Sequence, residues 1–155
     1  DLLPGRSIEG VATAALYAAA RMAATPRSLD ELARVSRVDR DELARAYRYI
    51  VRELRLEVQP ADPGSYVPRF VSELGVSDDL ERCAREMLTA AREQGLTSGK
   101  SPIGLAAAAI YAASLHTREP VTQREIADVS SVTAVTIRNR YGELVDLVSE
   151  DTETC

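Results

Sequence analysis

The residues best suited to chemistry lie between Thr122 and Leu147, and the chemistry that they suit is the recognition of DNA. Two short amphipathic helices are predicted there, joined by the three small residues 130–132, and Thr133 can cap the second helix. This arrangement is a helix-turn-helix, whose second helix meets base edges near its N-terminal end. The outward positions there give the candidate DNA-binding residues Thr133, Val135, Thr136, Arg138, Asn139 and Arg140.

The side chains of this helix match the groups that DNA presents in the major groove. Arginine reads guanine, asparagine reads adenine or a phosphate, and valine and the threonine methyl group suit thymine methyls. The same pattern also fits a helical hairpin that belongs to a bundle and touches no DNA. The pattern alone leaves both interpretations open.

The elements that position this helix occur twice along the chain. Residues 5–54 align without a gap onto residues 99–148, at a constant offset of ninety-four residues. The matched positions include Gly10 and Gly104, Ala14 and Ala108, Tyr17 and Tyr111, Pro26 and Pro120, Glu31 and Glu125, and Tyr47 and Tyr141. Chance does not produce such a match, so the chain is predicted to contain two copies of one helical module.

Each copy begins with a capping serine, Ser7 or Ser101, followed by an alanine-rich helix over about residues 8–24 or 102–116. Both helices are apolar almost all round, so we expect both to be central and buried. Neither is long enough to span a membrane.

A second helix pair, residues 28–36 and 39–55, is predicted in the first copy. Its last helix opens with Asp39, Asp41 and Glu42, whose carboxylates suit the helix dipole but would meet DNA phosphates head-on. The first copy is therefore not expected to read bases with this helix.

Between the copies, a short helix is predicted at about residues 65–74, and a long amphipathic helix runs from a cap at Ser77 to about Gln94, with Cys83 on its core face. The long helix opens the second copy. No counterpart precedes Gly5, so the first copy is expected to lack its first helix.

The predicted fold class is all-α, with a first repeat at residues 1–75, a second repeat with the helix-turn-helix at 76–149, and an acidic tail at 150–155.

Charge and composition narrow the class of protein. The net charge is −5, and Lys100 is the only lysine among nineteen basic residues. An acidic, arginine-rich surface of this kind is typical of salt-loving archaea, where long-range steering is screened within about 3 Å at 1 M salt. Binding to DNA must then depend on side chains that touch it directly and not on long-range attraction. With no membrane span and no signal peptide, the protein is predicted to be cytoplasmic.

No constellation predicts catalysis, a metal site or a cofactor, so we do not expect an enzyme. Residues 95–101 imitate a phosphate-binding loop, but three residues separate the glycines where four are needed, and a helix precedes them instead of a strand. His116, the only histidine, lies at a helix C-terminus, where a structural role is expected. Cys83 and Cys155 form no CxxC pair and predict neither a disulfide framework nor a zinc site.

Four motifs carry a resemblance to a known family: residues 5–10 (GRSIEG), 66–70 (YVPRF), 99–102 (GKSP) and 135–141 (VTIRNRY). With these motifs the sequence resembles archaeal transcription initiation factor B, the counterpart of the eukaryotic general factor IIB, over nearly the whole chain. Its composition is similar to that of the haloarchaeal members. The resemblance implies two tandem cyclin-like helical repeats, the second ending in a helix-turn-helix.

The resemblance also implies a function and its partners. Members of the family bind the TATA-binding protein on promoter DNA, and their second-repeat helix reads the B recognition element at positions that Val135 and Arg138 match. The other implied contacts are Gly5 and Arg6 with the minor groove, Lys100 with a phosphate, and Arg21 with the TATA-binding protein. Family members contact RNA polymerase mainly through an N-terminal zinc ribbon and linker, neither of which is in this sequence.

Two rival functions are weighed against this one. A cyclin-like adaptor would bind only protein. Such a protein would not need one helix start without acidic residues, at 133–136, and a matched helix start that keeps them, at 39–42. A free-standing repressor would bind a palindrome as a dimer, whereas two repeats within one chain predict an asymmetric site and a monomer.

Overall fold

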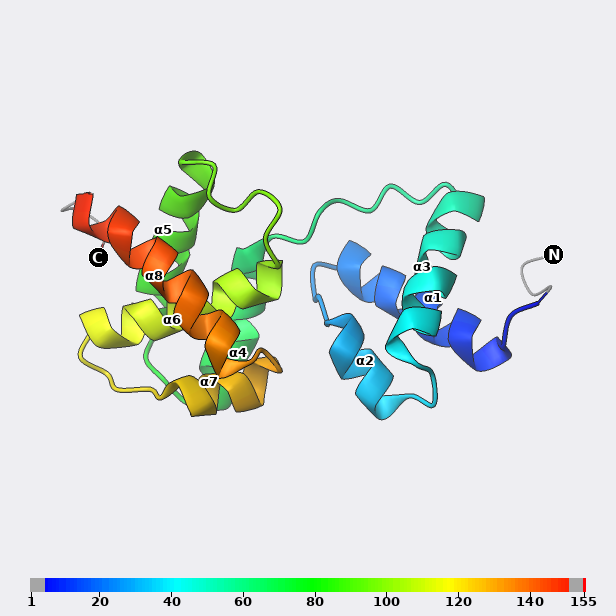
Figure 1. The fold of residues 1–155 in the computed structure, drawn as a ribbon, viewed down its shortest axis with the longest axis horizontal. Helices are drawn as coiled ribbons and strands as arrows, with labels where there is room; N and C mark the ends of the chain where they lie inside the picture. Colours follow the sequence, from blue (N-terminus) through cyan, green and yellow to red (C-terminus); the bar gives the residue numbers. More distant parts are fainter. Residues whose placement is uncertain (1–4, 151–154) are drawn as a thin grey trace. The chain divides into compact units, whose positions relative to one another are not determined.

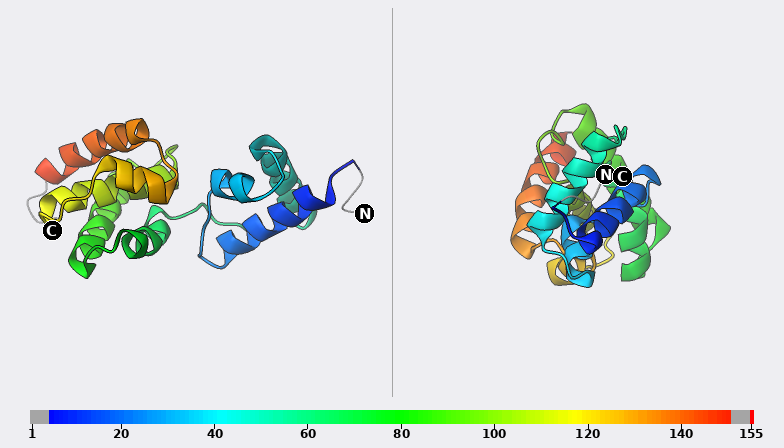
Figure 2. Two further views of the ribbon diagram at one scale, coloured as in Figure 1. Left: turned by 90° about the horizontal axis from the view of Figure 1, so that it is seen from below. Right: turned by 90° about the vertical axis from the view of Figure 1, so that its right-hand side faces the viewer.

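The computed structural model describes residues 5–150 and residue 155, and this part of the chain contains helices, turns and loops but no strand (Figures 1 and 2). Its contacts divide the chain into two compact units, residues 1–61 and 62–155. The all-α fold class predicted from the sequence is confirmed.

The first unit contains three helices: α1 (Ile8–Met22), α2 (Leu29–Val35) and α3 (Arg40–Glu53). The starts of α1 and α2 follow from capping side chains. Ser7 Oγ accepts a hydrogen bond from the Gly10 N–H at 3.0 Å, and Ser28 and Glu31 form a reciprocal capping box. Asp39, before α3, makes no such bond.

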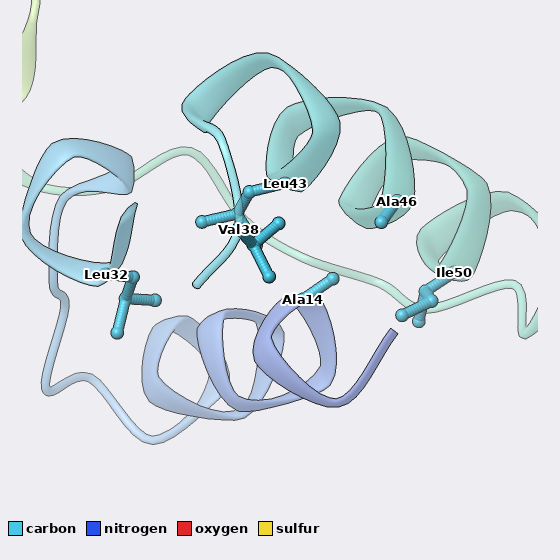
Figure 3. Close-up of a cluster of buried hydrophobic side chains, with 6 residues drawn as sticks. All are labelled: Ala14, Leu32, Val38, Leu43, Ala46 and Ile50. Atoms are coloured by element: carbon cyan, nitrogen blue, oxygen red, sulfur yellow. The ribbon is translucent and has the colours of Figure 1, made fainter. Parts of the chain in front are cut away.

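The core of the first unit lies between α1 and α3, with one contribution from α2 and one from the turn after it (Figure 3). Its buried members are Ala14, Leu32, Val38, Leu43, Ala46 and Ile50. Ala14 on α1 and Ala46 on α3 are small, which lets the two helices approach closely. These three helices therefore share one small hydrophobic core.

The second unit contains a 3₁₀ helix, η1 (Pro63–Tyr66), and five α-helices: α4 (Val67–Leu74), α5 (Asp78–Glu93), α6 (Pro102–His116), α7 (Gln123–Ser130) and α8 (Ala134–Glu150). Helix α6 contacts every other helix of the unit. Its residues 104–110 and 112–114 are buried. For this helix, the prediction of a central, buried position is confirmed.

The internal repeat persists in three dimensions. Helices α1 and α6 begin and end at positions ninety-four residues apart. In the first unit the ring centroids of Tyr17 and Tyr47 lie 4.8 Å apart with the planes at 78°. In the second unit the rings of Tyr111 and Tyr141 lie 5.0 Å apart at 72°. The same edge-to-face contact thus joins α1 to α3 in the first copy and α6 to α8 in the second.

The prediction that α1 is also central and buried is wrong. Only Gly10, Ala14 and Ala18 of this helix are buried, and Leu16 is 60% exposed. Among the described residues, α1 packs only against α2 and α3, whereas α6 packs against η1, α4 and α5 in addition to α7 and α8. An apolar helix needs neighbours on all sides to be buried, and α1 has them on one side.

The division into units differs from the predicted boundary after Gly75. Helix α4 was assigned to the first repeat, but it contacts α5, α6, α7 and η1. Its Val67, Phe70 and Val71 are buried in the second unit. Since these apolar side chains find their partners there, the second unit begins at Asp62.

The expectation about the cysteines is also corrected. Cys83 is a fully buried core residue, as predicted, but it forms a disulfide with Cys155 across 72 residues of sequence. The carbonyl oxygen of Cys155 also lies 2.7 Å from His116 Nε2 at the end of α6. Of the predicted tail, residue 150 ends α8, residues 151–154 lie outside the described part, and Cys155 is bonded to the core.

Candidate nucleic-acid interface

The turn between α7 and α8 is held by small polar side chains. Ser130 Oγ donates to the Ile126 carbonyl oxygen at 2.6 Å and accepts from the Val132 N–H at 3.2 Å. Ser131 takes the left-handed conformation, with φ 61°. Thr133 Oγ1 accepts from the Thr136 N–H at 3.2 Å, so it caps α8 as predicted. The sequence therefore builds the turn of a helix-turn-helix at this point.

The candidate residues on α8 fall into two groups. Thr133, Val135, Arg138 and Asn139 are exposed, with Val135 at 56%. Thr136 and Arg140 are half-buried. The Thr136 methyl group lies 3.4 Å from the position that a Cβ on Gly104 would take, so it packs against α6. The inner face of α8 is anchored by the buried Ile137 and Leu144, which fixes which side chains point outward.

Arg140 and Lys100 share one carboxylate. Lys100 Nζ lies 2.6 Å from Glu143 Oε2, and Arg140 Nη1 lies 2.7 Å from Glu143 Oε1. The hydrogen bond from Lys100 holds the pKa of Glu143 below its usual range against the opposing effect of burial, and Arg140 lowers it further. The carboxylate therefore stays ionised at neutral pH. The structure thus brings two predicted site residues together through a third that the sequence analysis did not select.

The loop before α1 holds the other two predicted DNA contacts. Gly5 is in the left-handed region, with φ +71°. The guanidinium carbon of Arg6 lies 3.4 Å from the centroid of the Tyr49 ring, a cation–π contact. A pocket of about 410 Å³ opens beside them, lined by Gly5, Arg6, Ser7, Gly10, Glu42, Arg45 and Ala46. Ser7 Oγ donates to Glu42 Oε1 at 2.7 Å, so an acid closes one side of this basic pocket.

Arg21 lies at the opposite end of α1 from that loop. Its Nη1 donates to the Tyr47 hydroxyl at 3.0 Å, and its Nη2 donates to the Gln59 carbonyl oxygen at 2.8 Å. Burial raises the pKa of the nearby Tyr17 hydroxyl, and the charge of Arg21 opposes that rise. Arg21 therefore ties the segment after α3 to α1 and α3, a role that the sequence analysis missed.

The two missed partners, Tyr49 and Glu143, occupy matched positions of the two repeats. The offset of ninety-four residues that matches Arg6 to Lys100 also matches Tyr49 to Glu143. In each copy, the cation before the alanine-rich helix contacts this one position of the last helix. The offset matches these positions to each other, but only the packed helices show that each of them meets a cation.

Two negative findings apply to residues 5–150 and 155. They contain no group of three or more His, Cys, Asp or Glu side chains placed to hold a metal ion. None of the helices described is long and apolar enough to cross a membrane.

The family model "Transcription factor TFIIB repeat" matches residues 1–53 and 56–147. The chain belongs to this TFIIB-repeat family. The resemblance inferred from the four motifs is confirmed, and the second matched segment, like the second unit, includes α4.

Individual relatives agree with the family. The chain is 69% identical over 147 residues to Transcription initiation factor IIB 2 of Haloferax volcanii, a match that covers 95% of the chain and 44% of the relative. It is 67% identical over 150 residues to Transcription initiation factor IIB 4 of Halobacterium salinarum, covering 97% and 46%. Transcription initiation factor IIB of Archaeoglobus fulgidus is 55% identical over 146 residues, covering 94% and 45%. The chain thus spans less than half the length of these relatives.

Proposed function

We propose that this chain is the promoter-binding core of an archaeal transcription initiation factor. It binds DNA beside a TATA box held by the TATA-binding protein, and α8 reads the B recognition element in the major groove. The observation that carries the proposal is the outward face of α8, where Val135, Arg138 and Asn139 are exposed and no acid lies in the first turn.

The matching helix of the first unit has the opposite character. Asp41 and Glu42 occupy the first turn of α3, and Arg40 is paired with Asp30 at 3.0 Å. Carboxylates at that point repel phosphates, so α3 is not a base-reading helix. The two matched helices therefore differ in whether their first turn carries acidic side chains. Base recognition needs a first turn without them, whereas a scaffold that binds only protein would not require this difference.

The exposed side chains of α8 have distinct roles in this proposal. Arg138 donates two hydrogen bonds to a guanine, and Val135 contacts a thymine methyl group. Asn139 pairs with adenine or a phosphate, and Thr133, at the helix start, contacts the backbone. Lys100 and Arg140 contact phosphates, and the loop of Gly5 and Arg6 contacts the minor groove.

The proposed partners are promoter DNA, the TATA-binding protein and RNA polymerase. Arg21 is proposed to face the TATA-binding protein while it holds Gln59. Polymerase contacts are assigned mainly to an N-terminal region outside this sequence. The protein acts in the cytoplasm as a monomer, because its two unequal repeats suit an asymmetric site.

A mobility-shift assay tests the proposal directly. Promoter duplex with an intact or scrambled B recognition element is titrated with the chain, with and without TATA-binding protein. Arg138→Ala should lose roughly 1–3 kcal/mol of binding free energy on the intact element and discriminate poorly between the two duplexes. Arg92→Ala, which removes an exposed arginine at the end of α5, is the matched control and should change neither.

The outcomes separate the rival functions. Equal loss on both duplexes would move Arg138 from base recognition to phosphate contact. No binding to either duplex with TATA-binding protein present would contradict the proposal. That result would favour a protein-binding adaptor, for which the exposed apolar side chains Ile8, Leu16 and Met22 of α1 offer a surface.

A further inference from the structure

We propose that Glu143 is a built-in competitor for DNA phosphate that weakens binding of Lys100 and Arg140 to DNA of any sequence. Its carboxylate bridges Lys100 and Arg140 in the place that a DNA phosphate would take. The inference rests on the proposed function and deepens it, because it assigns a role to an acid within the DNA-binding surface.

The contacts have the form of an occupied anion site. Each carboxylate oxygen takes one cation, Oε2 from Lys100 at 2.6 Å and Oε1 from Arg140 at 2.7 Å. A phosphodiester also offers two oxygens to neighbouring basic side chains. The side chain of Glu143 is 38% exposed, so an incoming phosphate can reach the cluster from solvent.

The first unit shows what the position does without an acid. Tyr49 stands where the second unit has Glu143, and its uncharged ring makes a cation–π contact with Arg6. Ala46 stands where the second unit has Arg140. The carboxylate bridge therefore occurs in the unit that carries the base-reading helix, and it is not needed to hold the loop cation against the last helix of a unit.

The consequence for DNA binding follows from exchange of one anion for another. On any duplex, a phosphate that contacts Lys100 competes with Glu143 for the ammonium group and lies beside the carboxylate, which repels it. The gain from phosphate contact is thereby reduced on all sequences. On the recognition element, the base contacts of Arg138 and Val135 add binding free energy that does not depend on the phosphate. DNA of the wrong sequence is held by phosphate contacts alone, so Glu143 keeps binding to it weak.

The test is Glu143→Gln, which keeps the side-chain shape and removes the charge. Affinity for a scrambled duplex without TATA-binding protein should rise roughly tenfold, and the slope of log affinity against log salt should steepen by about one. Affinity for the promoter duplex with TATA-binding protein should rise by a similar factor, because the same phosphate contact forms there.

Three further variants keep the result interpretable. Glu86→Gln on α5 changes the net charge equally and breaks an ion pair with Arg82 at 3.0 Å, so it should leave both affinities unchanged. Lys100→Ala combined with Glu143→Gln should cancel most of the gain. Glu143→Tyr introduces the residue type found at the matched position 49 and should reproduce the gain if glutamine disturbs the fold, which thermal unfolding reports.

The inference is overturned if Glu143→Gln and Glu143→Tyr leave scrambled-duplex binding unchanged or weaker, or if Glu86→Gln gives the same gain. These failures are distinct from failure of the proposed function. The latter appears as absence of wild-type binding to promoter with TATA-binding protein, and it would remove the basis of the inference. Wild-type promoter binding with an unresponsive Glu143 would reject the role of Glu143 alone.

Discussion

Helices α1 and α6 are matched copies of one alanine-rich segment, and yet they occupy different environments. Leu16 on α1 is 60% exposed, whereas the matched Ile110 on α6 is fully buried. The difference lies in their neighbours, because α6 is also covered by η1, α4 and α5. The sequence of an apolar helix therefore shows that it can be buried on all sides. The elements that surround it determine how much of it is buried.

The largest effect should come from truncating the two matched side chains. Ile110→Ala leaves a cavity in a fully packed core and should lower the free energy of unfolding of the second unit by about 2–5 kcal/mol. Leu16→Ala should change stability by no more than about 0.5 kcal/mol, because its side chain already meets solvent. Urea unfolding followed by far-UV circular dichroism measures both. Equal losses would show that α1 is covered in solution and that the two matched helices do not differ in burial.

A second difference between the units is covalent. The disulfide of Cys83 with Cys155 closes a long loop in the second unit, and among the described residues the first unit has no cysteine. Cys155→Ser should lower the stability of the second unit by about 2–4 kcal/mol, because the unfolded chain regains the freedom that the bond removes. Thermal unfolding with and without dithiothreitol measures the effect. The variant and the wild type should coincide under reducing conditions; a difference that persists there would assign the loss to something other than the bond.

The smallest effect concerns pH and the matched positions Tyr49 and Glu143. The pKa of Glu143 is lowered in the folded state, so its contribution to stability is present above the ordinary glutamate pKa and is lost as pH falls through the folded value. For a partly exposed pair the contribution is roughly 0.2–1 kcal/mol. Urea unfolding of wild type and Glu143→Gln at descending pH should show a difference that shrinks in acid. A difference that is constant with pH would mean that the carboxylate charge contributes nothing.

The sequence by itself determined the helices, the repeat and the outward face of α8. Capping residues such as Ser7 and Thr133 act within one turn of their own position, so their effect can be read locally. The spacing of Ile137 and Leu144 fixed which side of α8 is buried, and therefore which side chains point outward. These features depend on neighbours along the chain.

Tertiary structure decided the features that depend on residues distant in sequence. The exposure of Leu16, the placement of α4 in the second unit, and the bond between Cys83 and Cys155 follow from which elements pack together. The bridge from Lys100 to Glu143 likewise joins residues on a loop and a helix. A local pattern specifies which face of a helix can be buried, but only the packed chain determines what covers that face and which charges it pairs.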